Sequence, residues 1–304
     1  MDEILLTTDF SPQARKAYPV AVSMARQNDA RIHLVHEVER RPLWYRTTEV
    51  EICLQDMYDR LRGQLSDEAR LPIFAGQRLE EELLREGQPQ TGVVEFAHER
   101  RPDIVVIATH GRTGLKRLFL GSFAEKIVRY GGIPVLLVRQ EGEAQDFAPH
   151  NVLVPVDFSE AGSCVLPTAR FLAERYGATL NFFKVLDPAD YYYYYYYGVA
   201  TREAFDKTLD QTRDVAAAAR EQFTVLKERE LSGVKAEFQC TRGLPTHEIV
   251  CRAESSGADL VLISTHGRSG AKRVLLGSVA AEVVRSAPCS VLVVPERRVL
   301  GAPP

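Results

Sequence analysis

The chain contains one stretch twice, and this duplication limits the folds that it can adopt. Thr109–Ser122 recurs as Thr265–Ser278, and each copy ends in Gly-Ser before a helix-like segment. Each copy also follows a short apolar run, Ile104–Ile107 or Leu260–Ile263, typical of a strand buried on both faces in a parallel sheet. A glycine-containing loop between such a strand and a helix start presents free N–H groups and the positive end of the helix dipole. The pattern therefore predicts a site for an anion such as phosphate in each copy.

The repetition continues outside this stretch. Asp9 is matched by Asp157, 148 residues later, and Gly121 is matched by Gly277, 156 residues later. A repeat of this length is a duplicated domain and not a solenoid unit. The chain of 304 residues also has the length of about two domains. We therefore expect a first domain at 1–140, a polar linker at 141–150 and a second domain at 151–298.

Strands and helices are expected to alternate within each copy. In the first copy the pattern predicts, in order, strand Ile4–Thr8, helix Pro12–Asn28 with Ser11 as N-cap, strand Arg31–Val38, helix Thr48–Ala69, a weak strand ending at Arg85, helix Thr91–Arg100, strand Ile104–Ala108, a helix from Ser122 and strand Pro134–Val138. This alternation predicts an α/β fold with two tandem open, mostly parallel five-stranded sheets flanked by helices. Ligands of such sheets bind at the carboxyl ends of the strands, where the strand order reverses.

The third strand differs between the copies. Its apolar positions in the second copy alternate cleanly, and the sequence offset matches them to mostly charged residues in the first. The second-copy residues are Val234, Ala236, Phe238 and Cys240, and their expected counterparts are Arg78, Glu80, Glu82 and Leu84. Charges on a strand discourage unwanted pairing, which predicts that this strand lies at a sheet edge.

The charge balance argues against general binding to nucleic acids or anionic membranes. Lys and Arg total 38 against 41 Asp and Glu, a net charge of −3. No apolar run approaches the roughly 20 residues of a membrane span, and the chain starts with Met1-Asp2-Glu3 before an apolar strand. We therefore expect neither a membrane anchor nor a signal peptide.

The five cysteines include no C-x-x-C pair, which predicts reduced, mostly buried thiols in a cytoplasmic protein.

The loop residues admit a structural interpretation beside a functional one. The loops are neither a Walker A motif nor a dinucleotide fingerprint. In the structural interpretation they are turns that cap a helix, with Ser122 and Ser278 as the N-caps. Asp9 and Asp157 could bind a ribose or an adenine amino group, or form Asx turns at strand–helix junctions. The loop histidines have no nucleophile or acidic partner at a recognisable spacing, and no Cys/His cluster has zinc spacing. The sequence therefore predicts no catalytic residue and no metal ligand.

The second copy contains eight more residues than the first, between Lys184 and Gly243. Seven consecutive tyrosines, Tyr191–Tyr197, lie in this interval. Tyrosine favours strands, but the run shows no apolar alternation. It is expected to form a surface loop, or an aromatic flap that stacks over a base or a partner.

These residues resemble the universal stress protein family in its tandem two-domain form. The resemblance covers about Asp2–Arg139 and Asn151–Pro295, which is nearly the whole chain. Nucleotide-binding members of the family carry a G-2x-G-9x-G-(S/T) pattern. Gly111-9x-Gly121-Ser122 and Gly267-9x-Gly277-Ser278 match the second half of that pattern.

The resemblance implies a site for ATP or a related adenine nucleotide, with or without Mg²⁺. Ala108 and Ser264 replace the first glycine of the pattern. Val185 matches the family's adenine-contacting valine, but Glu37 stands at that place in the first copy, where a carboxylate would repel a polyphosphate or be costly beside a base. The second domain is therefore expected to be the better site. The residues implied there are Pro155, Val156, Asp157, Val185, Ser264, His266, Gly267, Arg268, Gly277, Ser278 and Val279. The weaker first-domain set is Asp9, Gly111, Arg112, Gly121 and Ser122.

The resemblance implies a cytoplasmic stress-response protein that binds the nucleotide as a sensor or switch. A nucleotide-independent interaction scaffold is the alternative, and Ala108 and Glu37 favour it for the first domain. A slow ATPase is a third hypothesis, although no general base, arginine clamp or Mg²⁺ carboxylate pair is evident. Family members pair through their last strand, so Val135–Val138 and Val291–Val294 are expected to join the two domains as a pseudo-dimer. Whole chains could then form a homodimer.

Overall fold

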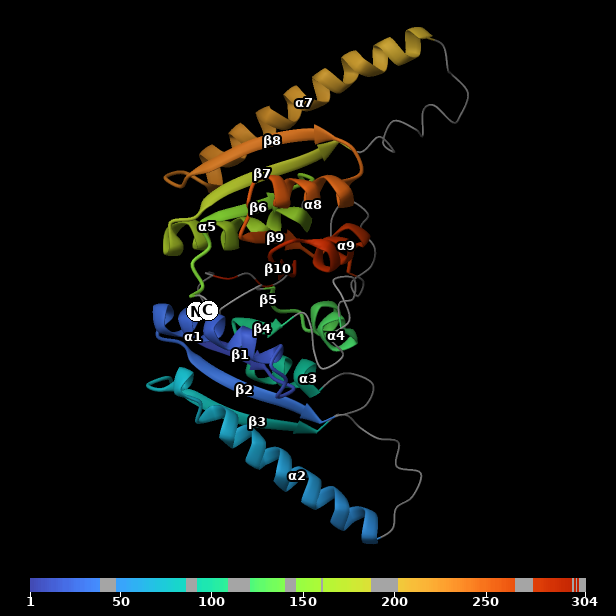
Figure 1. Cartoon of the computed structure of the whole chain (residues 1–304). Helices are drawn as coiled ribbons and strands as arrows, with labels where there is room; N and C mark the ends of the chain where they lie inside the picture. The colour runs from blue at the N-terminus through green and yellow to red at the C-terminus, as the bar shows by residue number, and fades with distance from the viewer. Residues whose placement is uncertain are drawn as a thin grey trace. The chain divides into compact units, whose positions relative to one another are not determined.

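The chain divides into two compact units, Met1–Phe147 and Ala148–Pro304, shown in a computed structural model (Figure 1). The structure describes residues 1–38, 48–85, 92–108, 121–139, 146–159, 161–186, 202–265, 276–296, 298 and 300. Among these residues, no helix combines the length and apolar character that crossing a membrane requires. Within the predicted linker, Phe147 belongs to the first unit, where it is buried and its carbonyl accepts a hydrogen bond from Gln27 Nε2 at 3.2 Å, and the residues from Ala148 belong to the second.

In each unit, helices alternate with strands as the sequence predicts. The elements of the first unit are β1 Glu3–Thr7, η1 Ala14–Ala17, α1 Tyr18–Asn28, β2 Arg31–Val38, α2 Thr48–Ala69, η2 Pro72–Phe74, β3 Leu79–Arg85, α3 Gly92–Arg100, β4 Ile104–Ala108, α4 Ser122–Tyr130 and β5 Val135–Val138. Those of the second unit are β6 Asn151–Pro155, η3 Ala161–Cys164, α5 Val165–Tyr176, β7 Thr179–Leu186, α7 Arg202–Glu230, β8 Ala236–Arg242, α8 Pro245–Ser255, β9 Leu260–Ser264, α9 Ser278–Ser286 and β10 Ser290–Val294.

The five strands of each unit follow the same order, and every pair is parallel. The first unit has the order β3-β2-β1-β4-β5, and the second has β8-β7-β6-β9-β10. The predicted α/β class with five-stranded, open parallel sheets is therefore confirmed. The order reverses between β1 and β4 and between β6 and β9, where the chain leaves in opposite directions. The Asp9 and Asp157 loops follow one strand of each switch point, and the glycine-containing loops follow the other.

The central strands form the core of each unit. Ile4, Leu5 and Leu6 of β1 have no exposed surface, and Leu153 and Leu262 of the second unit are equally buried. Burial of successive residues means that both faces of the sheet are covered, as expected for apolar strands without alternation. Each such side chain contributes about 2 kcal/mol through removal of apolar surface from water.

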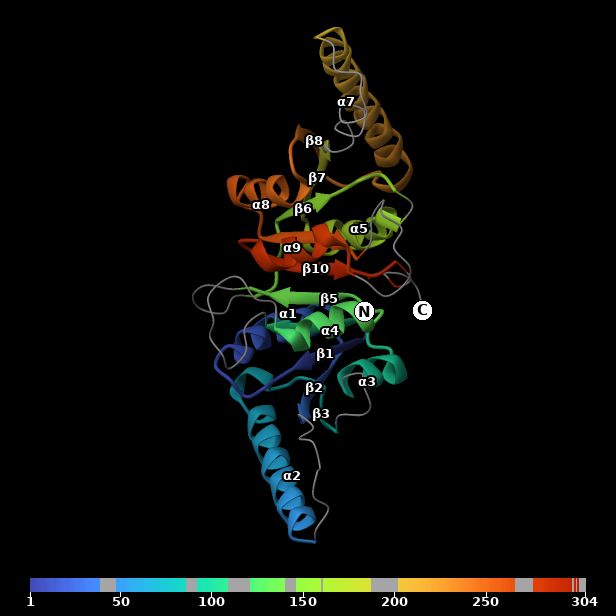
Figure 2. The same ribbon diagram turned by 90° about the vertical axis from the view of Figure 1, so that its right-hand side faces the viewer.

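The helices cover both faces of each sheet. Figure 2 shows α2 and α3 on opposite sides of β2 and β3, and α7 and α8 on opposite sides of β7 and β8. In the first unit, Tyr18 of α1 packs on Phe74 after α2, whereas Phe96 of α3 packs against His33 on the other face of β2. Since side chains alternate along a strand, the α3 face of β2 carries Arg31, His33 and Val35.

The first helix begins later than the sequence predicts. A 3-10 turn, η1, starts at Ala14, and α1 starts only at Tyr18 with Pro19 in its first turn. Ser11 nevertheless stabilises the start of η1, because its hydroxyl accepts a hydrogen bond from the Ala14 N–H at 3.1 Å. The prediction of helix from Pro12 was wrong because Pro19, not Pro12, occupies the first helical turn.

Strand pairing corrects the expected match between the third strands by one residue. Leu83 pairs with His36, and Cys240 pairs with Lys184, so Cys240 corresponds to Leu83 and not to Leu84. A shift of one residue moves every side chain to the opposite face. Glu80 and Glu82 therefore share the face of His33 and do not replace the apolar alternation of β8. The expected edge position is confirmed, because within each described unit β3 and β8 pair with one strand only.

Candidate functional site

The predicted aspartates form the same strained turn in both units. Asp9 Oδ1 accepts a hydrogen bond from Ser11 N–H at 3.0 Å, and Asp157 Oδ1 accepts from Ser159 N–H at 2.9 Å. The residue between them is left-handed in each case, with φ 65° at Phe10 and 58° at Phe158. A bulky side chain in this region costs about 1–2 kcal/mol and persists only where its surroundings fix it. The Asx-turn interpretation of both aspartates is thus confirmed, and it leaves a ligand role open.

Gly277 closes the second glycine-containing loop at the start of α9. Its N–H donates to the Thr265 carbonyl at 2.9 Å, and its own carbonyl accepts from Ala281 N–H at 2.9 Å. Gly277 is therefore the N-cap, and Ser278 is the first residue of the helix with an exposed side chain. The interpretation of Ser278 and Ser122 as N-caps was wrong, since Gly121 has the corresponding place before α4. The N–H groups in the first turn of α9 have no carbonyl acceptor within the helix, so they are able to bind an anion.

Glu37 caps a helix in the first unit. Its Oε2 accepts a hydrogen bond from Val93 N–H, in the first turn of α3, at 3.0 Å. A carboxylate at this place satisfies a free N–H and interacts favourably with the helix dipole. In the second unit, α8 begins with Pro245, which lacks an N–H and so leaves one fewer donor to satisfy, and the buried Val185 stands in place of the glutamate. Sequence comparison alone identified Glu37 as an obstacle to a nucleotide and missed its role as a cap.

Replacing Glu37 by glutamine is expected to destabilise the first unit by about 1 kcal/mol, because α3 loses a charged cap. Urea unfolding followed by amide hydrogen exchange of first-unit peptides, read by mass spectrometry, measures this loss. Glu95, in the first turn of α3 itself, provides a control, and Glu95→Gln is expected to cost less. A loss no larger for Glu37→Gln than for Glu95→Gln would contradict the capping role.

A cavity of about 510 Å³ lies beside the Asp157 turn in the second unit. Val156, Phe158 and Ser159 line it from the turn, Leu166 from α5, and residues of α7 between Ala218 and Leu226 from the opposite side. Among the predicted nucleotide-binding residues that the structure describes, only Val156 contributes to its wall. The cavity therefore lies on the α7 side of the turn, and Gly277 and Ser278 are not among its lining residues.

The corresponding place in the first unit is filled by a polar cluster. Tyr18 Oη lies 2.6 Å from Thr8 Oγ1 and donates to Glu68 Oε2 at 2.9 Å, and Arg15 Nε donates to both Glu68 oxygens at 3.1 Å. Burial raises the pKa of Tyr18 far above its ordinary value, so the hydroxyl stays protonated and donates. Ser163 and Leu166 stand 148 residues after Arg15 and Tyr18. The smaller side chains explain why the second unit has a cavity there.

The structure places some predicted site residues together and leaves others undetermined. Pro155, Asp157 and Val185 lie at the carboxyl ends of the neighbouring strands β6 and β7. Ser264 ends β9, which pairs with β6, and Val279 lies in the first turn of α9. The residues His266, Gly267, Arg268, Gly111 and Arg112 and the run Tyr191–Tyr197 lie outside the described residues.

Four of the five cysteines have a described side chain, and these are less buried than predicted. Cys164, Cys240 and Cys289 are half-buried, and Cys251 is exposed. Burial raises the pKa of the Cys164 thiol to about 12, and its Sγ lies 3.9 Å from the Val294 carbonyl. A thiol with so high a pKa is not a nucleophile at neutral pH.

Three comparisons with known proteins agree with this architecture. The model of the Universal stress protein family matches residues 1–139 and 149–295. A universal stress protein of Thermus aquaticus is 32% identical over 136 residues, which is 45% of this chain and 97% of that protein. The crystal structure of a universal stress protein from Archaeoglobus fulgidus has a TM-score of 0.64 at 18% identity and covers 97% of this chain and 98% of its own. A further solved structure, of a universal stress protein in complex with cAMP, is 25% identical, covers 49% of this chain and 98% of its own, and has a TM-score of 0.31.

Proposed function

The chain belongs to the universal stress protein family of stress-response proteins, and we propose that its second unit binds ATP or a related adenine nucleotide as a sensor or switch. The observation that carries the proposal is the pairing of β6 with β9. This pairing puts the Asp157 turn and the loop that ends at Gly277 on adjacent strands of the switch point. Ligands of open α/β sheets bind at this position.

Each part of the proposed site has a distinct role. The first N–H groups of α9, at Ser278 and Val279, hold the phosphates through hydrogen bonds and the helix dipole. Asp157, with an Oδ1 already used in its turn, offers its carboxylate to the ribose hydroxyls. Val185, buried at the end of β7, packs against the base.

The first unit is proposed to have a structural role instead. Glu37 brings a negative charge to the corresponding strand end, where it holds α3. Tyr18 and Glu68 fill the space that is a cavity in the second unit. A nucleotide in the first unit would have to approach a carboxylate that already has a partner, which disfavours binding there.

The test is a calorimetric titration of the full chain with ATP, ADP and cAMP, each with and without MgCl₂. Ligand released on denaturation is identified in parallel by mass spectrometry. One adenine-nucleotide site per chain is the expected result, and it is lost on replacement of Asp157 by alanine while Asp9→Ala retains it. Two equal sites would contradict the assignment to the second unit. Absence of binding by the folded chain would leave the interaction scaffold, and steady turnover of ATP would indicate an enzyme.

A further inference from the structure

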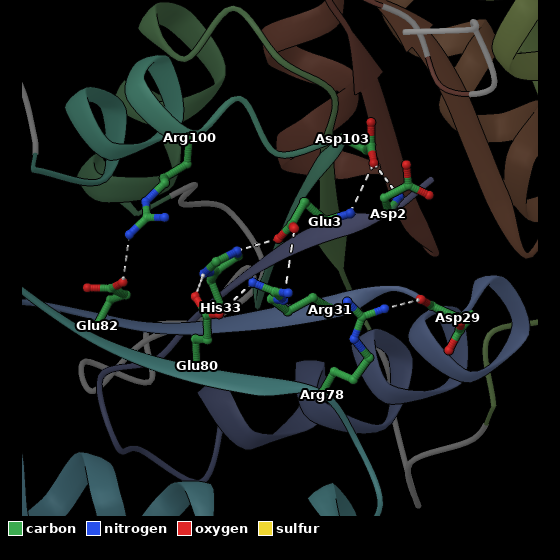
Figure 3. A network of polar contacts seen from close by, with 10 residues as sticks. All are labelled: Asp2, Glu3, Asp29, Arg31, His33, Arg78, Glu80, Glu82, Arg100 and Asp103. Atoms are coloured by element: carbon green, nitrogen blue, oxygen red, sulfur yellow. Dashed lines mark hydrogen bonds and ion pairs between the residues drawn. The ribbon is translucent and has the colours of Figure 1, made fainter.

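A buried histidine and three carboxylates form a cluster on the face of the first sheet that α3 covers (Figure 3). His33 lies on β2, Glu3 on β1, and Glu80 and Glu82 on β3. One ligand atom each from His33, Glu80 and Glu82 lies within 4.8 Å of the other two. The His33 side chain is 4% exposed, whereas Glu80 is 40% exposed. The imidazole thus lies at the bottom of the cluster, and the carboxylates connect it to solvent.

The hydrogen bond of His33 to Glu3 leaves its other ring nitrogen without a hydrogen-bond partner among the described residues. Its Nε2 is hydrogen-bonded to Glu3 Oε2, a carboxylate that accepts and so fixes the proton on Nε2. In the tautomer with the proton on Nε2, Nδ1 presents a lone pair, and this nitrogen is buried and has no hydrogen-bond partner among the described residues. This nitrogen lies 3.5 Å from Glu80 Oε2. Two acceptors that face each other at this distance require a positive charge between them, which either a proton on Nδ1 or a bound cation supplies.

We propose that His33 Nδ1, Glu80 and Glu82 bind a divalent transition-metal cation of the Zn²⁺ class, with Glu3 as the outer partner that orients the imidazole. Zinc binds imidazole nitrogen and carboxylate oxygen at about 2.0–2.2 Å, so tetrahedral ligand atoms are about 3.4 Å apart. The distance of 3.5 Å between His33 Nδ1 and Glu80 Oε2 fits this geometry. A ligating histidine whose other N–H donates to a carboxylate is the usual arrangement around such metals.

Two arginines position the carboxylates without cancelling their charge. Arg31 donates to Glu80 Oε1 at 2.6 Å, which turns Oε2 toward His33, and Arg100 lies 3.5 Å from Glu82 Oε1. Three carboxylates and two guanidinium groups leave a net negative charge around the imidazole, which attracts a cation. Phe96 packs edge-on against His33 at 5.6 Å between ring centres and limits the access of water to the ring.

The second unit shows that the fold does not need this cluster. Asn151 and Asn181 occupy the places of Glu3 and His33, each 148 residues later, and Asn181 Nδ2 donates to Asn151 Oδ1 at 2.6 Å. The strand start is fixed identically in both units, because Asp103 accepts from Glu3 N–H and Asp259 from Asn151 N–H, both at 3.1 Å. A neutral amide pair therefore meets the structural need of this position. The histidine and carboxylates of the first unit point to a further role, which is the binding of a cation.

The test is a calorimetric titration of Zn²⁺ into the metal-free full chain carrying Cys251→Ser. This background removes a competing site, since Cys251 Sγ lies 3.6 Å from His247 Nδ1 on α8. One Zn²⁺ per chain is expected, with the affinity for Mg²⁺ far lower because of the imidazole ligand. The double change Glu3→Asn and His33→Asn copies the second unit and is expected to abolish this binding in a folded chain, as verified by circular dichroism.

Matched variants on β3 separate ligation from general charge. Glu82→Gln is expected to weaken Zn²⁺ binding roughly tenfold or more, as is the outer-partner change Glu3→Gln. Glu81→Gln removes the same charge from an exposed side chain on the other face of the strand and is expected to change the affinity by less than about twofold. Equal effects of Glu81→Gln and Glu82→Gln would overturn the proposal. So would the absence of Zn²⁺ binding together with a doubly protonated His33 ring in nitrogen-15 NMR spectra, because a proton would then fill the space.

Discussion

Replacement of Gly277 by aspartate is expected to weaken nucleotide binding by about 100-fold or more, equivalent to about 2.7 kcal/mol. Gly277 is the N-cap of α9, and an aspartate there accepts hydrogen bonds from the N–H groups of the first helical turn. The carboxylate would occupy the donors that the phosphates need and repel their charge. The helix itself gains a favourable cap, so the unfolding free energy of the second unit is expected to stay constant or rise. Calorimetric titration with ATP and thermal unfolding measure the two quantities separately.

Two controls distinguish charge from space. A Cβ atom at Gly277 would lie 3.3 Å from the Thr265 carbonyl oxygen, which requires a shift of a few tenths of an ångström. Gly277→Ala introduces this contact alone and is expected to cost much less affinity than aspartate. Gly121, the corresponding residue of the first unit, has nothing within 4 Å of such a Cβ among the described atoms. If Gly121→Asp lowered the affinity as much as Gly277→Asp, the second unit would not be the binding site.

Replacement of Glu68 by alanine is expected to lower the unfolding free energy of the first unit by about 3 kcal/mol. Glu68 is 5% exposed and joins Arg15 to the buried hydroxyl of Tyr18. Its loss leaves the Tyr18 hydroxyl with Thr8 alone and opens a space between α1 and α2. The Arg15 side chain is 49% exposed and can turn to water, which places the loss at the lower end of the range for buried ion pairs. Urea unfolding followed by amide hydrogen exchange of first-unit peptides measures the change.

The neighbouring Asp67 provides the control for this prediction. Its side chain is 80% exposed, and its Oδ1 lies 3.8 Å from the guanidinium of Arg70, the residue after α2. Exposed pairs of this kind contribute less than about 1 kcal/mol, so Asp67→Ala is expected to change the stability little. Comparable losses for the two variants would mean that helix propensity, and not the buried cluster, explains the effect.

The fold was predictable because its signals are local and are present twice. The ranges Arg31–Val38, Thr48–Ala69 and Ile104–Ala108 were predicted from apolar periodicity and match β2, α2 and β4. The parallel order followed from the alternation of strands and helices. The pairing of the two units through their last strands, their boundaries and the nucleotide-binding residues stay predictions.

The features that sequence reasoning missed depend on contacts between distant segments. Glu37 contacts α3, 56 residues further along the chain, and no local pattern identifies a carboxylate as the cap of a remote helix. The His33 cluster draws ligands from strands 47 residues apart, outside the spacing of any zinc motif. The expected match of Glu80 and Glu82 to apolar residues of β8 was wrong. It used the 156-residue offset between corresponding glycines, and that offset does not fix the register of the strand.

The carboxylate of Glu37, which holds α3 in the first unit where the second unit has Val185, has a consequence for thermal stability. A ligand raises the unfolding free energy only of the unit that it occupies, in proportion to the logarithm of its concentration. Nucleotide in the second unit therefore protects one half of the polypeptide and leaves the other as it was. The temperature at which the nucleotide-bound protein begins to unfold is then set by the first unit, which binds no ligand.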